Sequence, residues 1–134
     1  MPGYFVIYPS HYLIYSRVTG LISRDEMVAL RQRTTLDPEF DPAFDVIVDL
    51  READLSAWSS SDISLMASAT ALDKSARRVI VADTDDKFGL ARVYATRRDL
   101  AGGEERILVV HTMAAGLDWL GLHRFDPSRE GREK

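Results

Sequence analysis

Three serines at the expected start of a helix are the first residues that could carry chemistry. They stand in the order Trp58-Ser59-Ser60-Ser61-Asp62, after a strand and a polar loop. A phosphate on one of these hydroxyls would face the free N–H groups of a helix N-terminus, although Asp62 would repel it. The alternative is helix capping, because Ser59 and Asp62 have the spacing of a capping box with Asp in place of Glu. Ser59, Ser60 and Ser61 are therefore phosphorylation candidates, and capping is the plainer interpretation.

Four aspartates at the ends of expected strands could hold a divalent cation. Asp49 ends one strand, and Asp83, Asp85 and Asp86 follow the next. Open α/β sheets place ligands at the carboxyl ends of their strands, and carboxylate oxygens suit divalent cations. A metal-dependent phosphotransfer enzyme would use them in this way, but Val18-Thr19-Gly20 before the first helix contains no acid. We expect turn formers and helix caps here, and predict no metal site.

Gly89, Arg92 and Tyr94 form a third group, early in a helix expected over residues 86–100. A glycine there would let a ligand approach the backbone, and Arg92 could pair with an anion. The alternative is a helix that packs through Tyr94 while Arg92 makes a surface ion pair. Together with Trp58, we take Arg92, Gly89 and Tyr94 as the candidate ligand-binding residues.

Histidine and cysteine patterns indicate no catalytic site. His11, His111 and His123 are each isolated from other ligand types, and the chain has no cysteine. The sequence contains no Gly-x-Ser-x-Gly motif, phosphate-binding Gly-Lys-Thr loop or His-x-x-x-His pattern. We therefore predict no catalytic residues and no cofactor, and a protein that is not an enzyme.

Five aromatic residues lie near loops or in the expected terminal helix. They could form an exposed apolar patch for a partner, a second subunit or a lipid. Core packing is the alternative, and we favour it slightly. The five are Phe40, Phe44, Trp58, Trp119 and Phe125.

Length and charge narrow the class of protein. A chain of 134 residues forms one domain, which we place at residues 1–122, with residues 123–134 as a polar C-terminal tail expected to be flexible. The net charge of −4, from 17 basic and 21 acidic residues, argues against a nucleic-acid partner. No apolar run approaches the roughly 20 residues that a membrane span needs, and the N-terminus does not resemble a signal peptide. We expect a soluble cytoplasmic protein.

The elements that must position these residues alternate between strand and helix. Strands are expected at residues 4–8, 12–18, 45–50, 79–82 and 106–110, with a polar loop at 51–61. Helices are expected from Ser23 to about residue 33, after Ser61, over 86–100 and after Thr112. The connection at residues 9–11 is short enough to force an antiparallel hairpin, and the continuous run Val46-Ile47-Val48 is typical of a parallel strand covered on both faces.

These elements predict an α/β fold. Its five-stranded mixed sheet has an antiparallel first strand and otherwise parallel strands, with about four helices around it. The pattern leaves the order of the strands beyond the hairpin open.

Several segments together resemble the SpoIIAA-like family of bacterial proteins, which has a STAS-type fold related to the CRAL-TRIO lipid-binding domains. The family has no established activity, so the resemblance implies the fold and not a function. A regulatory STAS domain would carry a phosphorylatable serine after an Asp at the start of the helix that follows the third strand, whereas here Trp58 precedes the serines. The resembling segments, which span about residues 5–122, are Gly20-Leu21-Ile22-Ser23, Asp37-Pro38-Glu39-Phe40, Val48-Asp49-Leu50-Arg51, residues 88–94 and residues 114–120.

Three functions remain as hypotheses. The leading one is a non-enzymatic regulatory or protein-interaction module that acts as a homodimer. The second is a carrier or sensor of a small apolar or lipid-like ligand, by analogy with CRAL-TRIO domains, and it requires an apolar cavity between sheet and helices. The third is a metal-dependent phosphotransfer enzyme, which requires at least three of the aspartates around one cation.

Overall fold

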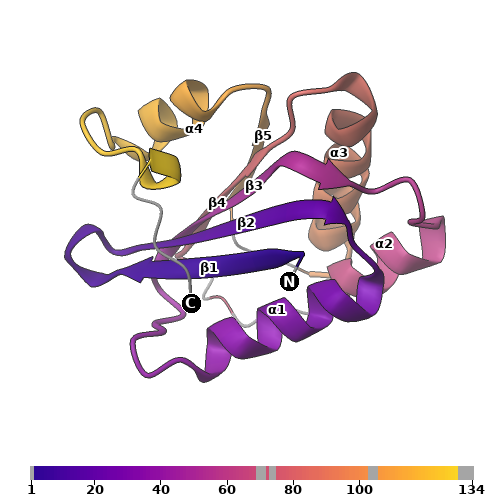
Figure 1. Ribbon diagram of the computed structural model, residues 1–134, viewed down its shortest axis with the longest axis horizontal. Helices are drawn as coiled ribbons and strands as arrows, with labels where there is room; N and C mark the ends of the chain where they lie inside the picture. Colours follow the sequence, from indigo (N-terminus) through magenta and orange to yellow (C-terminus); the bar gives the residue numbers. More distant parts are fainter. Residues whose placement is uncertain (1, 69–71, 73–74, 103–105, 130–134) are drawn as a thin grey trace.

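A five-stranded mixed sheet forms the centre of the protein. The structure is a computed structural model that describes residues 2–68, 72, 75–102 and 106–129. The strands lie in the order β1-β2-β3-β4-β5, so each strand lies beside its predecessor in the chain (Figure 1). β1 is antiparallel to β2, and the other neighbouring pairs are parallel. The strands are β1 (Gly3–Tyr8), β2 (Leu13–Leu21), β3 (Asp45–Asp54), β4 (Arg77–Val81) and β5 (Arg106–Val110).

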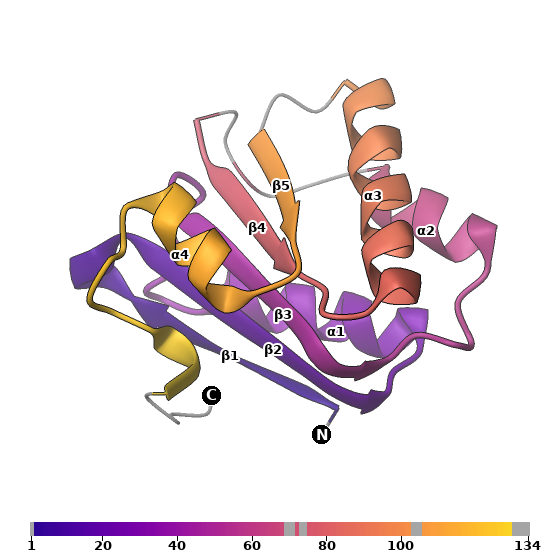
Figure 2. The ribbon, with the colours of Figure 1, turned by 90° about the horizontal axis from the view of Figure 1, so that it is seen from above.

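Four α-helices in the described part of the chain cover this sheet. They are α1 (Arg24–Leu36), α2 (Ser60–Ala67), α3 (Asp85–Leu100) and α4 (Met113–Leu120). The first three connect successive parallel strands and lie on one face, whereas α4 lies on the other (Figure 2). The α/β class, the mixed sheet with an antiparallel first strand and the four helices are confirmed.

Alternating side chains of the strands build two separate apolar cores. Ile14, Val46 and Ile80 belong to the core on the side of α1–α3, and their neighbours Leu13, Ile47 and Val79 belong to the core on the side of α4. Successive strand residues point to opposite faces, so a strand buried on both faces needs apolar residues without alternation. This arrangement explains the continuous apolar runs in β3 and β4.

β3 extends further than the sequence predicts. The expected strand ends at Leu50, but the strand continues to Asp54, through the segment 51–54 that we expected to be a loop. The extension pairs with the end of β2 after a register shift between Arg17 and Thr19, so that Glu52 lies opposite Thr19. Tertiary pairing of this kind overrides the low strand propensity of a polar segment.

The segment after residue 122 packs on the domain as far as the structure describes it. The ring of Phe125 stacks on His11, with 3.9 Å between centroids, and meets Tyr8 edge-on at 4.9 Å. The flexibility expected of the tail at residues 123–134 stays a prediction. Pro127 is buried at the start of a short 3-10 helix, Pro127–Arg129. Residues 130–134 lie outside the described residues.

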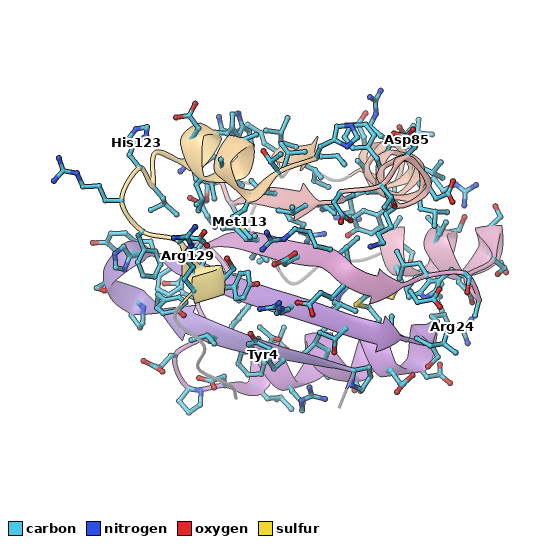
Figure 3. All side chains as sticks on the ribbon, turned by 45° about the horizontal axis from the view of Figure 1, so that its top comes forward. Tyr4, Arg24, Asp85, Met113, His123 and Arg129 are labelled. Atoms are coloured by element: carbon cyan, nitrogen blue, oxygen red, sulfur yellow. The ribbon has the colours of Figure 1, made fainter. Side chains whose placement is uncertain are left out.

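The amino ends of the helices on the first face mark the carboxyl end of the parallel sheet. Figure 3 places Arg24, at the start of α1, and Asp85, at the start of α3, at one end of the molecule, and His123 at the other. In the described part of the chain, none of the helices combines the length and the apolar character needed to cross a membrane.

Candidate ligand-binding site

An apolar pocket lies between the sheet and helices α1, α2 and α3. Its volume is about 180 Å³, and it is partly open to solvent. Most of the described residues that line it are apolar side chains of the core on this face, such as Ile14, Leu30 and Ile80. Its polar lining residues are Ser16, Arg31, Thr34, Thr35, Arg78 and Tyr94.

The sheet forms the floor of the pocket through alternate residues of three strands. Ile14, Ser16 and Val18 come from β2, and Val46, Val48 and Leu50 come from β3. Ile80 and Arg78 come from β4. The period of two in a strand places each of these sets on one face, so Arg78 points to the same side as Ile80.

The helices supply the rest of the lining at helical spacing. Met27, Leu30, Arg31 and Thr34 of α1 recur at intervals of three and four residues, which places them on one face of that helix. In α3 the same spacing holds for Leu90, Ala91 and Tyr94. The Ser23 capping box fixes the start of α1: the Ser23 hydroxyl accepts from the Glu26 N–H, and the Glu26 carboxylate accepts from the Ser23 N–H.

Arg78 and Tyr94 are joined inside this face of the protein. Nη1 of Arg78 donates a hydrogen bond to the Tyr94 hydroxyl, and the guanidinium lies 5.7 Å from the centre of the Tyr94 ring. Arg78 is only 7% exposed. A guanidinium stays protonated even when buried, so the bond holds a cation next to the apolar lining.

Arg31 brings a second guanidinium to the same region. Its Nη1 donates to the Met66 carbonyl at the end of α2, at 3.3 Å. Burial is the main cause that lowers the pKa of Arg31, and the nearby charges of Arg78 and Arg98 lower it further. Tyr94 acts in the opposite direction and raises this pKa. Three positive charges from α1, β4 and α3 therefore lie close enough to affect one another.

Comparison with known proteins found no matching family model, no matching curated protein and no matching solved structure. The resemblance to the SpoIIAA-like family therefore stays a prediction. The function has to be argued from the geometry of the pocket and its polar wall.

Two of the four predicted ligand-binding residues line the pocket. Tyr94 contributes its ring and hydroxyl, and Trp58 contributes its indole, whose Nε1 donates to the Ile22 carbonyl at 2.8 Å. Arg92 and Gly89 are exposed and are not among the described lining residues. The Arg92 guanidinium lies 6.0 Å from the ring centre of Phe88, and a Cβ on Gly89 would meet open space, so no close approach requires a glycine there.

Sequence reasoning missed Arg31 and Arg78. Arg78 begins the apolar run Arg78-Val79-Ile80-Val81, two residues before Ile80, so the period of two would have placed it on the buried face. Arg31 lies four residues after Met27 and three before Thr34, on the inward stripe of α1. Both signals were in the sequence, but a long charged side chain at such a position is usually assumed to reach solvent.

The three serines form the start of α2. The Ser59 hydroxyl accepts from the Asp62 N–H at 3.2 Å, and Asp62 accepts from the Ser59 N–H at 2.9 Å, which completes the expected capping box. Arg97 of α3 donates to the Ser60 hydroxyl at 2.8 Å. The Ser61 hydroxyl lies 3.0 Å from that of Ser59. These contacts give the serines a structural role, and their phosphorylation stays a prediction.

The aspartates considered as metal ligands lie in ion pairs, in a helix start or in a hydrogen-bonded buried position. In the described residues, no three His, Cys, Asp or Glu side chains come together as a metal site would require. Lys87 lies 3.2 Å from Asp83, and Asp85 and Asp86 occupy the first turn of α3. Asp49 is bound by Tyr15 and Arg51, on the sheet face opposite the pocket.

The histidines and the loop aromatics have contacts within the fold. His111 stacks on Phe88 at 4.0 Å, and Nδ1 of His123 lies 3.3 Å from Asp118. The aromatic residues considered as an exposed patch are packed against the cores or line the pocket. They are Phe40 and Phe44 on the pocket side, Trp58 in the pocket wall, and Trp119 and Phe125 on the side of α4.

Proposed function

We propose that this protein binds a small apolar ligand in the pocket between the sheet and helices α1–α3, and acts as a carrier or sensor rather than as an enzyme. The observation that carries the proposal is an apolar pocket of about 180 Å³. Protein interiors are close-packed and leave few voids larger than a water molecule. An apolar cavity of roughly 150 Å³ is large enough to bind benzene.

The pocket volume limits the size of the ligand. Pockets for drug-sized molecules have volumes of roughly 300–1,000 Å³, well above the volume found in this protein. The ligand body should therefore be about one aromatic ring or a short aliphatic chain. This size limit restricts the lipid-like ligand expected from the CRAL-TRIO analogy to molecules smaller than a membrane lipid.

A sensor of this kind would be one form of the regulatory module predicted from the sequence. The homodimer, a protein partner and a cytoplasmic location stay predictions. The large apolar side chains that are exposed come from several different elements, and no single surface among the described residues favours a partner. They are Tyr12, Leu21, Leu36, Leu65, Val93 and Leu100.

Toluene is a suitable probe, because it is neutral and has one ring. We expect toluene to raise the melting temperature of the wild-type protein by about 5 °C at ten times its Kd. At that concentration mass action stabilises the folded state by about 1.4 kcal/mol, which corresponds to a shift of this size in a domain of this length. Differential scanning fluorimetry over a toluene series measures it.

Two variants of α3 make the measurement specific to the pocket. Ala91 is buried and lines the pocket, so Ala91→Met should fill part of the volume with a flexible side chain and abolish the shift. Ala95→Met changes the same helix at a position outside the described lining residues, and it should keep the shift. The proposal fails if toluene does not shift the wild type, or if a folded Ala91→Met protein responds as the wild type does.

A further inference from the structure

A single hydroxyl lies on the otherwise apolar part of the sheet that β2 and β3 contribute to the pocket. Ser16 of β2 lines the pocket between Ile14 and Val18 of the same strand, which are both buried. Its register partners are Phe5 on β1 and Val48 on β3. Ser16 itself is only partly buried, and its side chain points to the pocket side of the sheet. Its hydroxyl is therefore accessible to a ligand in the pocket.

The other polar groups that line the pocket are bonded within the fold. The Thr34 hydroxyl donates to the Leu30 carbonyl at 2.8 Å. The Thr35 hydroxyl donates to the Gln32 carbonyl at 3.0 Å. The guanidinium groups, the phenol and the indole of the lining have the partners described above. Ser16 differs from them, because no group in the described part of the chain forms a hydrogen bond with its hydroxyl.

The Ser16 hydroxyl imposes a condition on the ligand. A ligand that fills the pocket excludes water from this hydroxyl, and a polar group that loses water without gaining another partner weakens binding. A wholly apolar ligand cannot replace the lost hydrogen bonds. A ligand with one suitably placed polar group avoids the loss, since a serine hydroxyl can donate one hydrogen bond and accept others.

We propose that the ligand is a small neutral alcohol or phenol, whose hydroxyl is hydrogen-bonded to Ser16 while its apolar body fills the pocket. This inference rests on the proposed function and adds the chemical class of the ligand. A hydroxyl fits because it can both donate and accept, as the serine hydroxyl can, so the bond forms in either direction.

Charge and size restrict the ligand to this class. A carboxylate or phosphate needs more donors than one serine supplies, and the arginine side chains of the lining are already bonded within the fold. An ammonium ion would be repelled by the same guanidinium groups. The volume of about 180 Å³ leaves room for one ring or a short chain with its hydroxyl.

Phenol and toluene form the test pair, because they have nearly the same shape and differ by a hydroxyl in place of a methyl group. Ser16→Ala should raise the Kd of phenol about tenfold, since it leaves the phenol hydroxyl without its partner in the pocket. Toluene should bind Ser16→Ala as tightly as it binds the wild type, or more tightly. Isothermal titration calorimetry measures the four dissociation constants.

Thr19→Val is the matched control. Thr19 lies on the same strand, but it is not among the described lining residues, and valine removes its hydroxyl with little change of shape. Both dissociation constants should stay at their wild-type values in this variant. Without ligand, Ser16→Ala should melt at least at the wild-type temperature, because the fold does not use the hydroxyl that it removes. Differential scanning fluorimetry measures this temperature.

The possible outcomes separate this inference from the proposed function. If toluene binds the wild type but phenol does not, the apolar pocket is kept and the hydroxyl-bearing ligand is overturned. The same conclusion follows if Ser16→Ala leaves the Kd of phenol unchanged, weakens both probes equally, or has an effect that Thr19→Val reproduces. If neither probe binds the folded wild type, the proposed function itself fails.

Discussion

At the scale of single residues, Asp49 is a buried charge that is stabilised by hydrogen bonds. Its carboxylate is 2% exposed and accepts from the Tyr15 hydroxyl at 2.6 Å and from Arg51 Nε at 2.9 Å and Nη2 at 2.8 Å. Burial raises the pKa of Asp49, but the hydrogen bonds from Arg51 and Tyr15 outweigh it and hold the pKa below its ordinary value. The same contacts give Asp49 a structural role in the fold.

This lowered pKa gives the stability of the protein a defined pH dependence. A carboxyl with a lower pKa in the folded state stabilises the fold above its unfolded pKa of about 3.9. That stabilisation is lost as the pH falls through the lower, folded value. Stability should therefore fall on the acid side of about pH 4, because Asp49 must then be protonated inside the protein.

Tyr15→Phe tests the hydrogen bond directly. We expect it to lower the free energy of unfolding at neutral pH by about 1.5–3 kcal/mol, because an ionised acceptor loses a buried donor. The difference from the wild type should shrink as the pH falls and Asp49 becomes protonated. Urea denaturation between neutral pH and about pH 3 measures both effects.

Tyr12→Phe serves as the control for Tyr15→Phe. The Tyr12 side chain is 69% exposed, so removing its hydroxyl should leave the free energy of unfolding unchanged. A Tyr15→Phe deficit that stays constant down to acid pH would show that the hydroxyl does not act on the ionised form of Asp49.

Residue types and spacing predicted part of the candidate site. Tyr94 was a candidate because it follows Gly89 and Arg92 early in an expected helix, and Trp58 was one of the aromatic residues near expected loops. The period of two in β4 indicated that Arg78 points inward, but the sequence could not show that Arg92 is exposed, since that depends on how α3 packs on the sheet. The two arginines that line the pocket, Arg31 and Arg78, are brought together only when α1 and β4 are packed.

At the scale of elements, α4 approaches the sheet closely because of a glycine. A Cβ on Gly116 would lie 2.5 Å from Cγ1 of Val79, closer than two such atoms can lie. Any side chain at this position would push α4 away from β4 or displace Val79. Gly89 in α3 provides a natural comparison, because a Cβ there would meet open space.

Gly116→Ala and Gly89→Ala form a matched pair for this contact. Both gain the helix propensity of alanine, so we expect Gly89→Ala to stabilise the protein by about 0.5–1 kcal/mol. Gly116→Ala should be less stable than Gly89→Ala by about 1–3 kcal/mol, which is the usual cost of overpacking. Thermal or urea denaturation of both variants measures this difference, and equal stabilities would contradict the close packing of α4.

Element boundaries were predicted best where caps and apolar runs coincide. The Ser23 and Thr112 caps were located correctly from their local patterns, whereas the strand expected at 79–82 begins two residues earlier and ends one residue earlier, at Arg77–Val81. The end of β3 was not, since residues 51–54 are mostly polar and become a strand only by pairing with the end of β2. The strand propensity of a segment contains no information about pairing with a strand that is distant in sequence.

At the scale of the whole molecule, the segment 123–129 joins the carboxyl end of the chain to the first hairpin. Phe125 contacts both His11 and Tyr8 and packs, partly buried, against the core on the side of α4. We expect Phe125→Ala to lower the free energy of unfolding by about 1–3 kcal/mol, because it loses two aromatic contacts and their buried area. Urea denaturation measures this loss.

Leu36→Ala is the control for Phe125→Ala. Leu36 is 82% exposed at the end of α1, so its truncation should change stability by less than about 0.5 kcal/mol. If Phe125→Ala were equally harmless, the segment 123–129 would not be docked on the hairpin in solution.

The alternation of strands and helices predicted the mixed sheet, but it left the strand order open. The order follows from packing: each of the helices α1–α3 returns the chain to the strand position next to the previous one. Many orders share the same alternation pattern, so sequence periodicity alone could not choose among them.

The strand order has a consequence for how the protein is made. A chain leaves the ribosome amino end first, and here each new strand finds its neighbour already present, so none must insert between two earlier strands. The described residues that line the pocket all fall between Ile14 and Tyr94, before β5 and α4 are synthesised. The face that contains the pocket can thus assemble on the nascent chain, and the ligand that we propose could enter it before translation ends.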